Sequence, residues 1–483
     1  MLSIEVGNLR SKIAGDLSAQ ALQEIDDKLS FEIPGAFFAK RYNPFAGTTR
    51  LFARADFSFP TGLIHYVTAI LKQHGITCHL TDIRTPVKLG KELPLHNLTL
   101  RQYQLDTVDT AVKKQRGIIK AGTGAGKTNI INGIVAKLNV PTLILIHKTD
   151  IFYQIIDRLE AVLKVPIGRI GDAECDIKPI TVGMIQSVSQ AFVKGRTRTI
   201  KGKKKYVPDS DEVKKRKEKV VEYVESIHCI ITDEAHHVPA DTFTLVQKKA
   251  VNALYRYGMT ASPWRDTGDD LLIEASTGKI LVDIPSSKLI DMGYLVQPLV
   301  QLLEFKHPRK PRNDKKYPEI YNEEVMNNAD RNAMICQVAL DAAKAGKTVL
   351  IAITKVEHGQ ILEAMLKQDD PNALFVFGES DSAVRRSVLK ELDRRERKIV
   401  ICTTIFGEGV DVPNLDVLIN AKAGNSSVDA FQLIGRVIRS ALGKTKAYLV
   451  DIHDTNCKYL EAHSMAREKN LPHRTQISYQ ICI

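Results

Sequence analysis

The residue types best suited to catalysis begin with a glycine-rich run, residues 121–128, that reads AGTGAGKT. Glycine lacks a Cβ, so the backbone N–H groups of such a run can surround phosphate oxygens at the N-terminus of a helix. Lys127 can hold the β- and γ-phosphates of ATP, and the Thr128 hydroxyl can bind Mg²⁺. The predicted ATP-binding residues of the run are Gly122, Thr123, Gly124, Ala125, Gly126, Lys127 and Thr128. The alternative is a glycine-rich turn without a ligand, which a predicted strand before it and a predicted helix after it disfavour.

An acidic pair, Asp233 and Glu234, follows the apolar residues 228–232. A carboxylate at the end of a buried strand can hold Mg²⁺ through water, and its neighbour can orient and deprotonate an attacking water. We predict these roles for Asp233 and Glu234 respectively, with Thr128 and Asp233 as the metal-binding residues. A helix N-cap or a surface turn is the ordinary alternative for such a pair. The phosphate-binding run upstream favours the chemical interpretation.

A third set of residues could supply positive charge to a transferring phosphoryl group. Gln432, Arg436 and Arg439 are spaced i, i+4 and i+7, which places them on one face of a helix. Arginine in this role stabilises the charge that develops during hydrolysis. The alternative is an amphipathic helix whose basic residues face solvent.

These residues require a scaffold of parallel strands and helices. From about residue 105, short apolar runs alternate with longer helical stretches, which is typical of a mostly parallel sheet covered by helices. The predicted strands are residues 117–121, 142–146, 228–232 and 255–259, then 348–353, 373–377, 398–402, 416–420 and 446–450. They form two α/β units in tandem. Residues 305–322 carry three prolines and many charges, which predicts a linker rather than core.

The first 95 residues have a different pattern. Helices are predicted near residues 19–29 and 62–75, on either side of a strand at residues 50–59. We expect a separate small α+β domain.

Composition narrows the class of protein further. The formal net charge of +12 over 483 residues favours a polyanionic partner. The seven cysteines include no C-x-x-C pair, which argues against a zinc site or a disulfide framework and for a reducing compartment. Neither a membrane span nor a signal peptide is predicted, so we expect a cytoplasmic protein.

One segment, residues 194–219, is strongly basic. Its cations are Lys194, Arg196, Arg198, Lys201, Lys203, Lys204, Lys205, Lys214, Lys215, Arg216, Lys217 and Lys219. Gly202 and Pro208 favour a protruding hairpin or arm over a packed helix. We hypothesise that this arm grips duplex DNA, and a solvated insertion without function is the alternative.

Together these segments resemble the superfamily 2 helicases over residues 100–454. Residues 100–104 (LRQYQ) are similar to the adenine-reading element, 121–128 to motif I, 233–236 (DEAH) to motif II and 260–262 to motif III. Residues 147–149, 182–187 and 354–355 are similar to motifs Ia, Ic and IV, and residues 403–411 and 432–439 to motifs V and VI. The common order of the motifs makes the resemblance far more specific than any one of them.

The resemblance implies a fold and further site residues. The fold is α/β, with two tandem RecA-like P-loop domains, residues 96–300 and 301–483, behind an N-terminal α+β nucleic-acid-binding domain, residues 1–95. Further ATP-binding residues are implied at Arg101, Gln104, Gly409 and Asp411. The implied nucleic-acid contacts are Lys148, Gly183, Gln186, Thr354, Lys355, Thr403 and Thr404.

Within the superfamily, the chain is most similar to phage recombination helicases and, more distantly, to XPB-type DNA helicases. Residues 30–32, 44–45 and 62–63 resemble the phage N-terminal domain, which is similar to a double-stranded RNA-binding domain. Gly378, Glu379, Arg385 and residues 450–454 extend the similarity into the second motor domain.

The resemblance implies an ATP- and Mg²⁺-dependent DNA helicase or translocase. Branched or duplex DNA, and single strands, would be its partners in branch migration, fork regression and short duplex unwinding during recombination, replication and repair. An RNA helicase is one alternative. The motor of a restriction system is another, but it would need a nuclease domain, which the sequence does not indicate. A non-hydrolysing DNA-binding scaffold is a third, and it would have no need of Lys127, Glu234 and Arg439.

Overall fold

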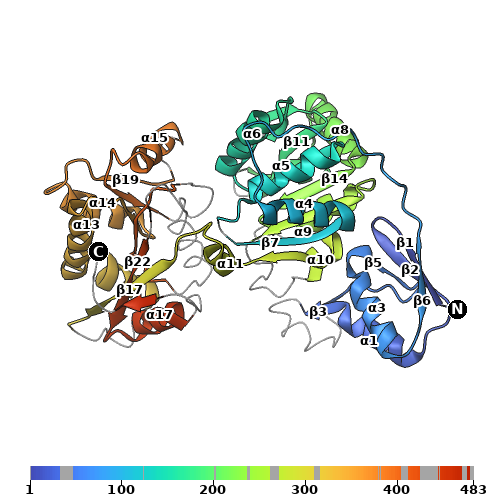
Figure 1. The fold of residues 1–483 in the computed structure, drawn as a ribbon, viewed down its shortest axis with the longest axis horizontal. Helices are drawn as coiled ribbons and strands as arrows, with labels where there is room; N and C mark the ends of the chain where they lie inside the picture. The colour runs from blue at the N-terminus through green and yellow to red at the C-terminus, as the bar shows by residue number, and fades with distance from the viewer. Residues whose placement is uncertain are drawn as a thin grey trace. The chain divides into compact units, whose positions relative to one another are not determined.

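The computed structural model describes residues 2–32, 47–122, 124–200, 203–235, 240–260, 271–308, 316–378, 380, 382–403, 412–424, 444, 446–469 and 476–478. The chain divides into two compact units. The first consists of Met1–Gly122 and Gly126–Ile284, and the second of Thr123–Ala125 and Pro285–Ile483 (Figure 1).

The first unit is built on an eight-stranded sheet of order β10-β9-β11-β8-β14-β15-β7-β16. All of its neighbours are parallel except β9 and β10. The strands are β7 (Arg116–Ala121), β8 (Thr142–Ile146), β9 (Gly168–Gly171), β10 (Glu174–Asp176), β11 (Ile180–Met184), β14 (Cys229–Asp233), β15 (Tyr255–Thr260) and β16 (Ile280–Ile284). Strands β8, β14 and β15 are buried along their whole length, as parallel strands covered on both faces must be.

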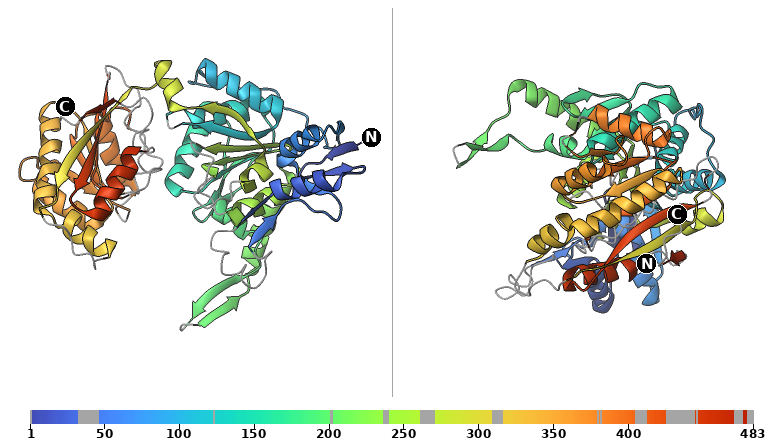
Figure 2. Two further views of the ribbon diagram at one scale, coloured as in Figure 1. Left: turned by 90° about the horizontal axis from the view of Figure 1, so that it is seen from below. Right: turned by 90° about the vertical axis from the view of Figure 1, so that its left-hand side faces the viewer.

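Helices cover this sheet on both sides (Figure 2). They are α4 (Gln102–Lys114), α5 (Lys127–Leu138), α6 (Thr149–Leu163), α7 (Ile185–Gln190), α8 (Asp211–Ser226), α9 (Ala240–Lys249) and α10 (Leu271–Thr277). The four strands predicted for this unit are confirmed to within one residue at each end. Strands β9, β10, β11 and β16 were not among those predicted.

The N-terminal part contains a four-stranded sheet of order β5-β2-β1-β6, and a two-stranded sheet of β3 and β4. These strands are β1 (Leu2–Val6), β2 (Arg10–Ala14), β3 (Ser30–Glu32), β4 (Thr48–Arg50), β5 (Ser58–Pro60) and β6 (Cys78–Asp82). The two predicted helices are confirmed as α1 (Ala19–Lys28) and the pair η1 (Thr61–Leu63) and α3 (Ile64–Gln73).

The single strand predicted at residues 50–59 is wrong. Arg50 ends β4 and Ser58 begins β5, because the chain reverses between them. Phe57 has a φ of 55°, in the left-handed region, and Asp56 Oδ1 accepts a hydrogen bond from Ser58 N at 3.2 Å. Such an aspartate turn ends one strand and starts the next.

The N-terminal part packs on α10 of the first unit through η1. A Cβ at Gly62 would lie 2.6 Å from the carbonyl oxygen of Ala275, so only glycine allows this approach. Ala275 belongs to the same buried cluster as Ile4, Phe59 and Val67. The N-terminal part is therefore fixed to the first α/β unit by a shared core.

The second unit contains a seven-stranded parallel sheet of order β19-β20-β18-β21-β22-β17-β23. Its strands are β17 (Pro298–Lys306), β18 (Val349–Ala352), β19 (Leu374–Val376), β20 (Ile399–Cys402), β21 (Val417–Asn420), β22 (Ala447–Thr455) and β23 (Gln476–Ser478). Its helices are α11 (Ser286–Asp291), α12 (Tyr317–Ile320), the π-helical η3 (Tyr321–Met326), α13 (Ala329–Lys344), α14 (Val356–Leu366), α15 (Ser382–Asp393) and α17 (Lys458–Lys469). The five strands predicted here are confirmed, with β22 longer than expected.

The linker predicted at residues 305–322 is wrong at both ends. Phe305 lies in β17, and residues 317–326 are helical. Ile320 and Tyr321 are buried in a small apolar cluster with Cys457 and Leu460. The prolines and charges obscured these apolar residues, which become core only because α17 lies beside them.

The basic segment forms a β-hairpin followed by a helix. Strands β12 (Arg196–Ile200) and β13 (Lys203–Val207) form a separate two-stranded sheet that extends away from the larger sheet (Figure 2). The predicted hairpin is confirmed. However, Lys214–Lys219 lie in α8, which packs through Val220 and Val224, so the prediction against a packed helix is wrong for this half.

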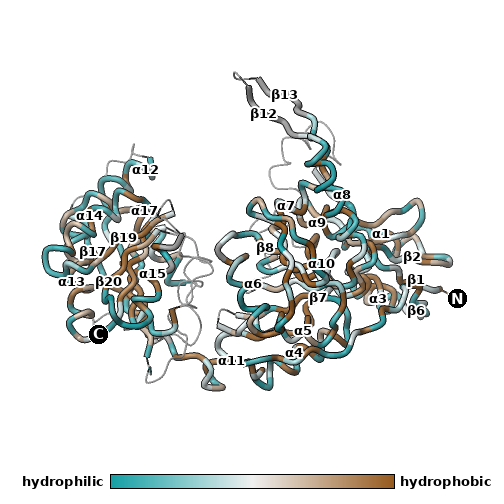
Figure 3. The backbone as a smooth tube through the Cα atoms, turned by 90° about the horizontal axis from the view of Figure 1, so that it is seen from above, coloured by the Kyte–Doolittle hydropathy of each residue, from teal (hydrophilic) through white to brown (hydrophobic). Residues whose placement is uncertain are grey.

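Hydropathy follows the layers, with apolar residues concentrated along the inner strands and polar residues along exposed stretches (Figure 3). Among the described residues, none of the helices combines the length and apolar character needed to span a bilayer.

Candidate nucleotide and nucleic-acid sites

The glycine-rich run connects β7 to α5, as the sequence predicts. Gly124 and Gly126 have φ angles of +85° and +72°, which L-residues with a side chain rarely adopt. A Cβ at Gly126 would also lie 2.6 Å from Nε2 of Gln104. The run begins with Gly122 N donating to Ile284 O of β16 at 2.9 Å. Its conformation therefore depends on glycine, and Thr123 lies outside the described residues.

The acidic pair lies at the same edge of the sheet as this loop. Asp233 is the last residue of β14, and β15 separates β14 from β7, all three strands running parallel. The Lys127 ammonium group forms an ion pair with Oε1 of Glu234. The fold thus brings together Lys127, Asp233 and Glu234. Glu234 has a φ of 45°, and strained non-glycine residues of this kind cluster at functional sites.

The Asp233 carboxylate is buried beside one cationic and one anionic side chain. Burial raises its pKa to about 6, Lys127 opposes that effect and Glu234 adds to it. Its side chain is 7% exposed, and Oδ1 accepts no hydrogen bond from any residue that the structure describes. A buried carboxylate oxygen of this kind is costly unless a cation takes it up.

The residues present therefore fit Mg²⁺ held by few protein groups. Asp233 and Thr128 would supply hard oxygen ligands, and Mg²⁺ commonly takes one or two carboxylates together with substrate phosphates and water. Within the described ranges, the chain has no cluster of three or more His, Cys, Asp or Glu that could form an all-protein metal cage.

Gln104 and Arg101 link α4 to the phosphate loop. Oε1 of Gln104 accepts a hydrogen bond from Arg101 N at 3.0 Å, which caps the N-terminus of α4. The Gln104 side chain is 2% exposed, and its Nε2 faces Gly126. Sequence reasoning missed this capping role. The spacing of Arg101 and Gln104, from N-cap to third helical residue, was the available signal.

The nucleic-acid contacts predicted for the first unit lie at the ends of two neighbouring strands, β8 and β11. Lys148 is the N-cap residue of α6, and Gln186, at the start of α7, donates from Nε2 to His147 O at 3.3 Å. The structure thus brings Lys148 and Gln186 to one edge. Gly183 has a packing role as well, because a Cβ there would lie 2.8 Å from Cγ2 of Val188.

In the second unit, Thr354 and Lys355 follow β18. Thr354 Oγ1 donates to Lys422 O at 3.4 Å. The Lys355 ammonium group donates to Oδ1 of Asn322 and lies 5.5 Å from the ring centroid of Tyr321. Lys355 is therefore positioned by the π-helical η3.

The remaining predicted residues fall at or beyond the limits of the described ranges. Thr403 follows β20 and is 5% exposed. Thr404, Gly409, Asp411, Gln432, Arg436 and Arg439 lie outside the described residues, as does His236.

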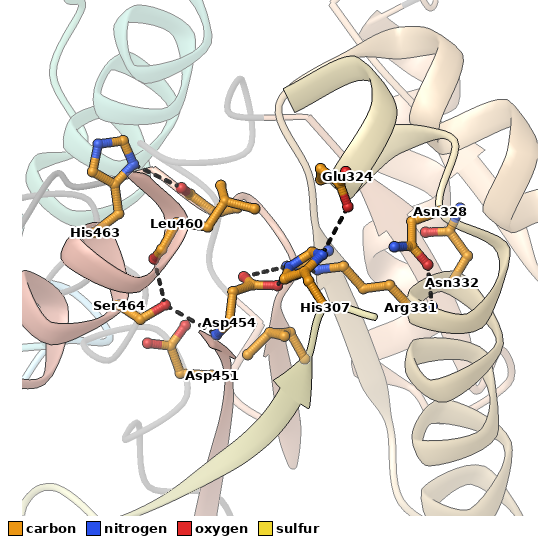
Figure 4. A network of polar contacts seen from close by, with 12 residues as sticks. His307, Glu324, Asn328, Arg331, Asn332, Asp451, Asp454, Leu460, His463 and Ser464 are labelled. Atoms are coloured by element: carbon orange, nitrogen blue, oxygen red, sulfur yellow. Dashed lines mark hydrogen bonds and ion pairs between the residues drawn. The ribbon is translucent and has the colours of Figure 1, made fainter. Parts of the chain in front are cut away.

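A buried polar network holds η3 in place, and sequence reasoning missed it (Figure 4). His307 Nδ1 lies 3.0 Å from Oε2 of Glu324 in η3, and His307 Nε2 lies 3.1 Å from Oδ1 of Asp454 in β22. Arg331 of α13 donates from Nε to the same Oδ1 at 2.8 Å. His307, Arg331 and Asp454 are all fully buried. Asp454 falls within the family-like residues 450–454, but His307 and Arg331 belong to no motif, so the sequence does not predict that the three meet.

Comparison with known protein families places two helicase domains in the chain. The model described as "Type III restriction enzyme, res subunit" matches residues 97–265, and the model described as "Helicase conserved C-terminal domain" matches residues 330–441. With the two parallel sheets and the phosphate site, they define tandem RecA-like helicase domains of superfamily 2. The chain is thus a nucleic-acid-dependent ATPase of the helicase class.

Full-length relatives place it more narrowly within that class. The chain is 23% identical over 484 residues to the ATP-dependent DNA helicase uvsW of Enterobacteria phage T4, which covers 92% of this chain and 89% of the relative. It is 24% identical over 388 residues to the DNA 3'-5' translocase XPB2 of Sulfurisphaera tokodaii, covering 74% and 81% of the two chains.

Among solved structures, a variant of S. cerevisiae Dbp5 bound to RNA and ADP BeF3 has a TM-score of 0.52, with 12% identity over 79% of this chain and 95% of that one. This likeness concerns the fold alone. By sequence, the chain is homologous to the phage T4 UvsW helicase and to the XPB helicases.

Proposed function

We propose that the chain is a Mg²⁺- and ATP-dependent DNA helicase or translocase that remodels branched DNA by branch migration, fork regression and short duplex unwinding. The processes it would serve are recombination, replication and repair, in the cytoplasm, or in the host cytoplasm for a phage-encoded chain. The observation that carries the proposal is the meeting of Lys127, Asp233 and Glu234 at one edge of the first sheet.

The proposed hydrolysis begins from the ion pair between Lys127 and Glu234. The triphosphate competes with Glu234 for the Lys127 ammonium group, and the loop amides and Gly126 bring the backbone close to the phosphates. Once Lys127 is engaged, Glu234 exchanges its ammonium partner for the attacking water and accepts its proton. Thr128 and Asp233 would hold Mg²⁺, which would supply charge neutralisation at the phosphates.

Asp233 holds a buried carboxylate oxygen in position for Mg²⁺. Gln104 holds the loop from the α4 side and, by resemblance, also reads the adenine. Gln432, Arg436 and Arg439 are proposed to complete the site from the second domain.

We propose that ATP hydrolysis is coupled to DNA binding through residues at the ends of the parallel strands. Lys148 and Gln186 lie at the edge of the first sheet that also carries Asp233, because β11, β8 and β14 are neighbouring parallel strands. A change at the phosphate site can therefore reach the nucleic-acid contacts through one rigid edge. Lys355 and Thr354 are proposed to grip the same strand from the second domain, with alternate closure and opening during each ATP cycle.

The preference for branched DNA is supported by likeness to the phage helicase across 92% of the chain, which includes the N-terminal part. In the proposed scheme, residues 1–95 form a nucleic-acid-binding domain, 96–300 the first motor domain and 301–483 the second. The N-terminal part shares a core with α10, so DNA bound there would be held in fixed register with the first motor domain.

One panel of substrates tests this proposal. ATPase and unwinding rates are measured with forks, four-way junctions, plain duplex and structured RNA of matched length. We expect forks and junctions to stimulate hydrolysis most and to be remodelled. The Glu234→Gln variant serves as the matched control, since it should bind ATP and DNA but not turn over. Stimulation by RNA above that by matched DNA would contradict the proposal in favour of an RNA helicase.

A further inference from the structure

The ribbon of β12 and β13 has two faces of different composition. Directly opposed residues in an antiparallel pair share a face with alternate residues along each strand. The register pairs Arg196 with Val207, Arg198 with Lys205 and Ile200 with Lys203. The positions on one face, called the cationic face below, are Arg196, Arg198, Lys203 and Lys205, with Ile200 and Val207 at its two ends. The opposite face carries Thr197, Thr199, Lys204 and Tyr206.

The cationic face is unfavourable for an isolated ribbon. Arg198 and Lys205 are directly opposed, and like charges in that arrangement destabilise strand pairing. A two-stranded hairpin is already marginal in water, and in the described part of the chain β12 and β13 pair with no third strand. Phosphate groups over this face would convert the repulsion into attraction and release condensed counterions. Its composition therefore fits a polyanion better than it fits solvent.

The base of the ribbon is anchored. Asp209 Oδ2 accepts hydrogen bonds from Gly195 N at 2.9 Å and from Lys217 Nζ at 2.7 Å. Lys217 also donates to Val193 O. Asp209 thus ties the chain that enters β12 to the helix that follows β13. The ribbon backbone extends away from the larger sheet above this anchored base (Figure 2).

The residue types on the two faces distinguish double-stranded from single-stranded DNA. Proteins that bind single strands stack the bases on aromatic side chains. The cationic face carries no aromatic position, and Tyr206 lies on the opposite face. A two-stranded β-ribbon also has the width that the major groove of duplex DNA admits. Backbone phosphates of a duplex are the ligand that this combination fits.

We propose that the cationic face of the β12–β13 ribbon binds the phosphate backbone of double-stranded DNA. This inference rests on the proposed function, because it assigns the duplex arm of the branched substrate to a particular surface. The ribbon takes no part in hydrolysis, so its loss should separate duplex binding from basal ATP turnover.

The test is a variant of the full chain in which the four cations of this face are neutralised, Arg196→Gln with Arg198→Gln, Lys203→Gln and Lys205→Gln. Its affinity for a plain duplex and for a single strand is measured by fluorescence anisotropy across a salt series. We expect duplex affinity to fall about tenfold or more, and the slope of log affinity against log salt to become shallower by about 2–4. Basal ATPase activity and single-strand affinity should change by less than about twofold.

Two controls isolate the face from the total charge. Replacing Lys306, Lys344, Arg394 and Lys458 by Gln removes the same formal charge from exposed positions of the second unit. This variant should bind the duplex like the wild type. The single variants Arg198→Gln and Lys204→Gln remove one charge from opposite faces, and Arg198→Gln should weaken duplex binding more.

Unchanged duplex affinity and salt slope in the fourfold ribbon variant would overturn the inference. An equal loss of duplex affinity in the second-unit control would also overturn it, as would a loss of affinity for single strands alone. The outcome is distinguishable from failure of the proposed function. If DNA fails to stimulate the wild-type ATPase, the proposed function is wrong whatever the ribbon binds. If stimulation is normal and the ribbon variant matches wild type, only the inference about the ribbon is wrong.

Discussion

Two buried carboxylates lie at the ends of parallel strands, one in each unit, and their surroundings shift their pKa values in opposite directions. Asp233 ends β14, and burial raises its pKa to about 6. Asp454 lies one residue before the end of β22. Burial raises its pKa as well, but Arg331 and His307 more than offset that effect and bring it to about 2.

The difference lies in where each carboxylate finds its partners. Asp454 finds its partners within the protein. Arg331 donates hydrogen bonds to its carboxylate from Nε and from a terminal nitrogen, and His307 contacts the same carboxylate. Asp233 has a buried oxygen that no described residue satisfies. A buried charge paired internally is held for structure, whereas a buried carboxylate oxygen that no described residue satisfies is costly to the fold and available to a ligand. Of these two carboxylates, Asp233 therefore has an oxygen available to a ligand, whereas Asp454 is committed to the network that holds η3.

The largest expected effect tests whether the charges of the first unit perform chemistry. Lys127→Ala removes the phosphate clamp, so kcat/KM for ATP should fall about a thousandfold, with loss of ATP binding. Glu234→Gln keeps the clamp and removes the base, so ATP should still bind while turnover falls about a hundredfold or more. Steady-state ATPase assays with fluorescent-nucleotide binding measure both.

Lys137→Ala is the control for Lys127, because this lysine lies on the same helix and pairs with the exposed Asp109. It should behave like the wild type. Normal turnover in Glu234→Gln would refute its assignment as the base.

The second largest effect tests whether the buried ion pair of Asp454 and Arg331 stabilises the second unit. Asp454→Asn leaves Arg331 buried and without its anionic partner, which should destabilise this unit by about 3–5 kcal/mol. Hydrogen exchange of peptides covering β17 and β22 should lose a matching amount of protection, while ATP binding to Lys127 is retained. The exposed Asp341→Asn should cost less than about 0.5 kcal/mol. Equal protection in Asp454→Asn and Asp341→Asn would show that the network in Figure 4 contributes no stability.

This contrast also explains what the sequence could and could not predict. The strands β8, β14 and β18 were predictable because each is an apolar run rich in β-branched residues and leucine. The loop with Lys127 and the pair Asp233 and Glu234 were predictable because neighbouring residues carry their chemistry.

Interactions between distant residues were not predictable in the same way. His307, Arg331 and Asp454 meet only when β17, α13 and β22 have folded together. The prolines and charges of residues 305–322 predict a linker, whereas Ile320 and Tyr321 are buried there because α17 packs against them. The capping role of Gln104 was hidden behind its resemblance to an adenine-reading residue.

Because the pKa of Asp233 is raised and that of Asp454 is lowered, the two carboxylates should respond differently to acid. Asp233 takes up a proton as the pH falls through about 6, and a protonated carboxyl no longer serves as an anionic ligand for Mg²⁺. At limiting Mg²⁺, ATP turnover should therefore fall below about pH 6, and added Mg²⁺ should restore it. Asp454 stabilises its unit fully above the ordinary aspartate value, and that contribution is lost only as the pH falls from about 4 toward about 2.

Two measurements check this contrast. A Mg²⁺ titration of ATPase activity at several pH values should show weaker apparent metal affinity at low pH. Burial raises the pKa of Asp451, the other buried carboxylate of β22, so the second measurement uses the Asp451→Asn variant. In this variant, hydrogen-exchange protection of β22, corrected for intrinsic rates, should stay constant between about pH 5 and 7. An acid response of β22 protection in that window would contradict the assigned partners of Asp454.

The smallest expected effect concerns the cost of keeping Asp233 charged in the absence of ligand. Burial raises its pKa above the value in the unfolded chain, so at neutral pH the ionised form destabilises the native state. Asparagine has nearly the same shape and cannot ionise. The metal- and nucleotide-free Asp233→Asn variant should therefore be more stable by about 1 kcal/mol, with a Tm higher by about 2 °C, although its ATPase activity is lost. Thermal unfolding in a chelating buffer measures this difference, which should shrink as the pH falls from about 6 toward about 4 because wild-type Asp233 then becomes neutral as well. The sign is opposite to that of Asp454→Asn, which destabilises its unit. A lower Tm for Asp233→Asn at neutral pH would mean that the protein itself satisfies this carboxylate, and the distinction between the two units would then fail.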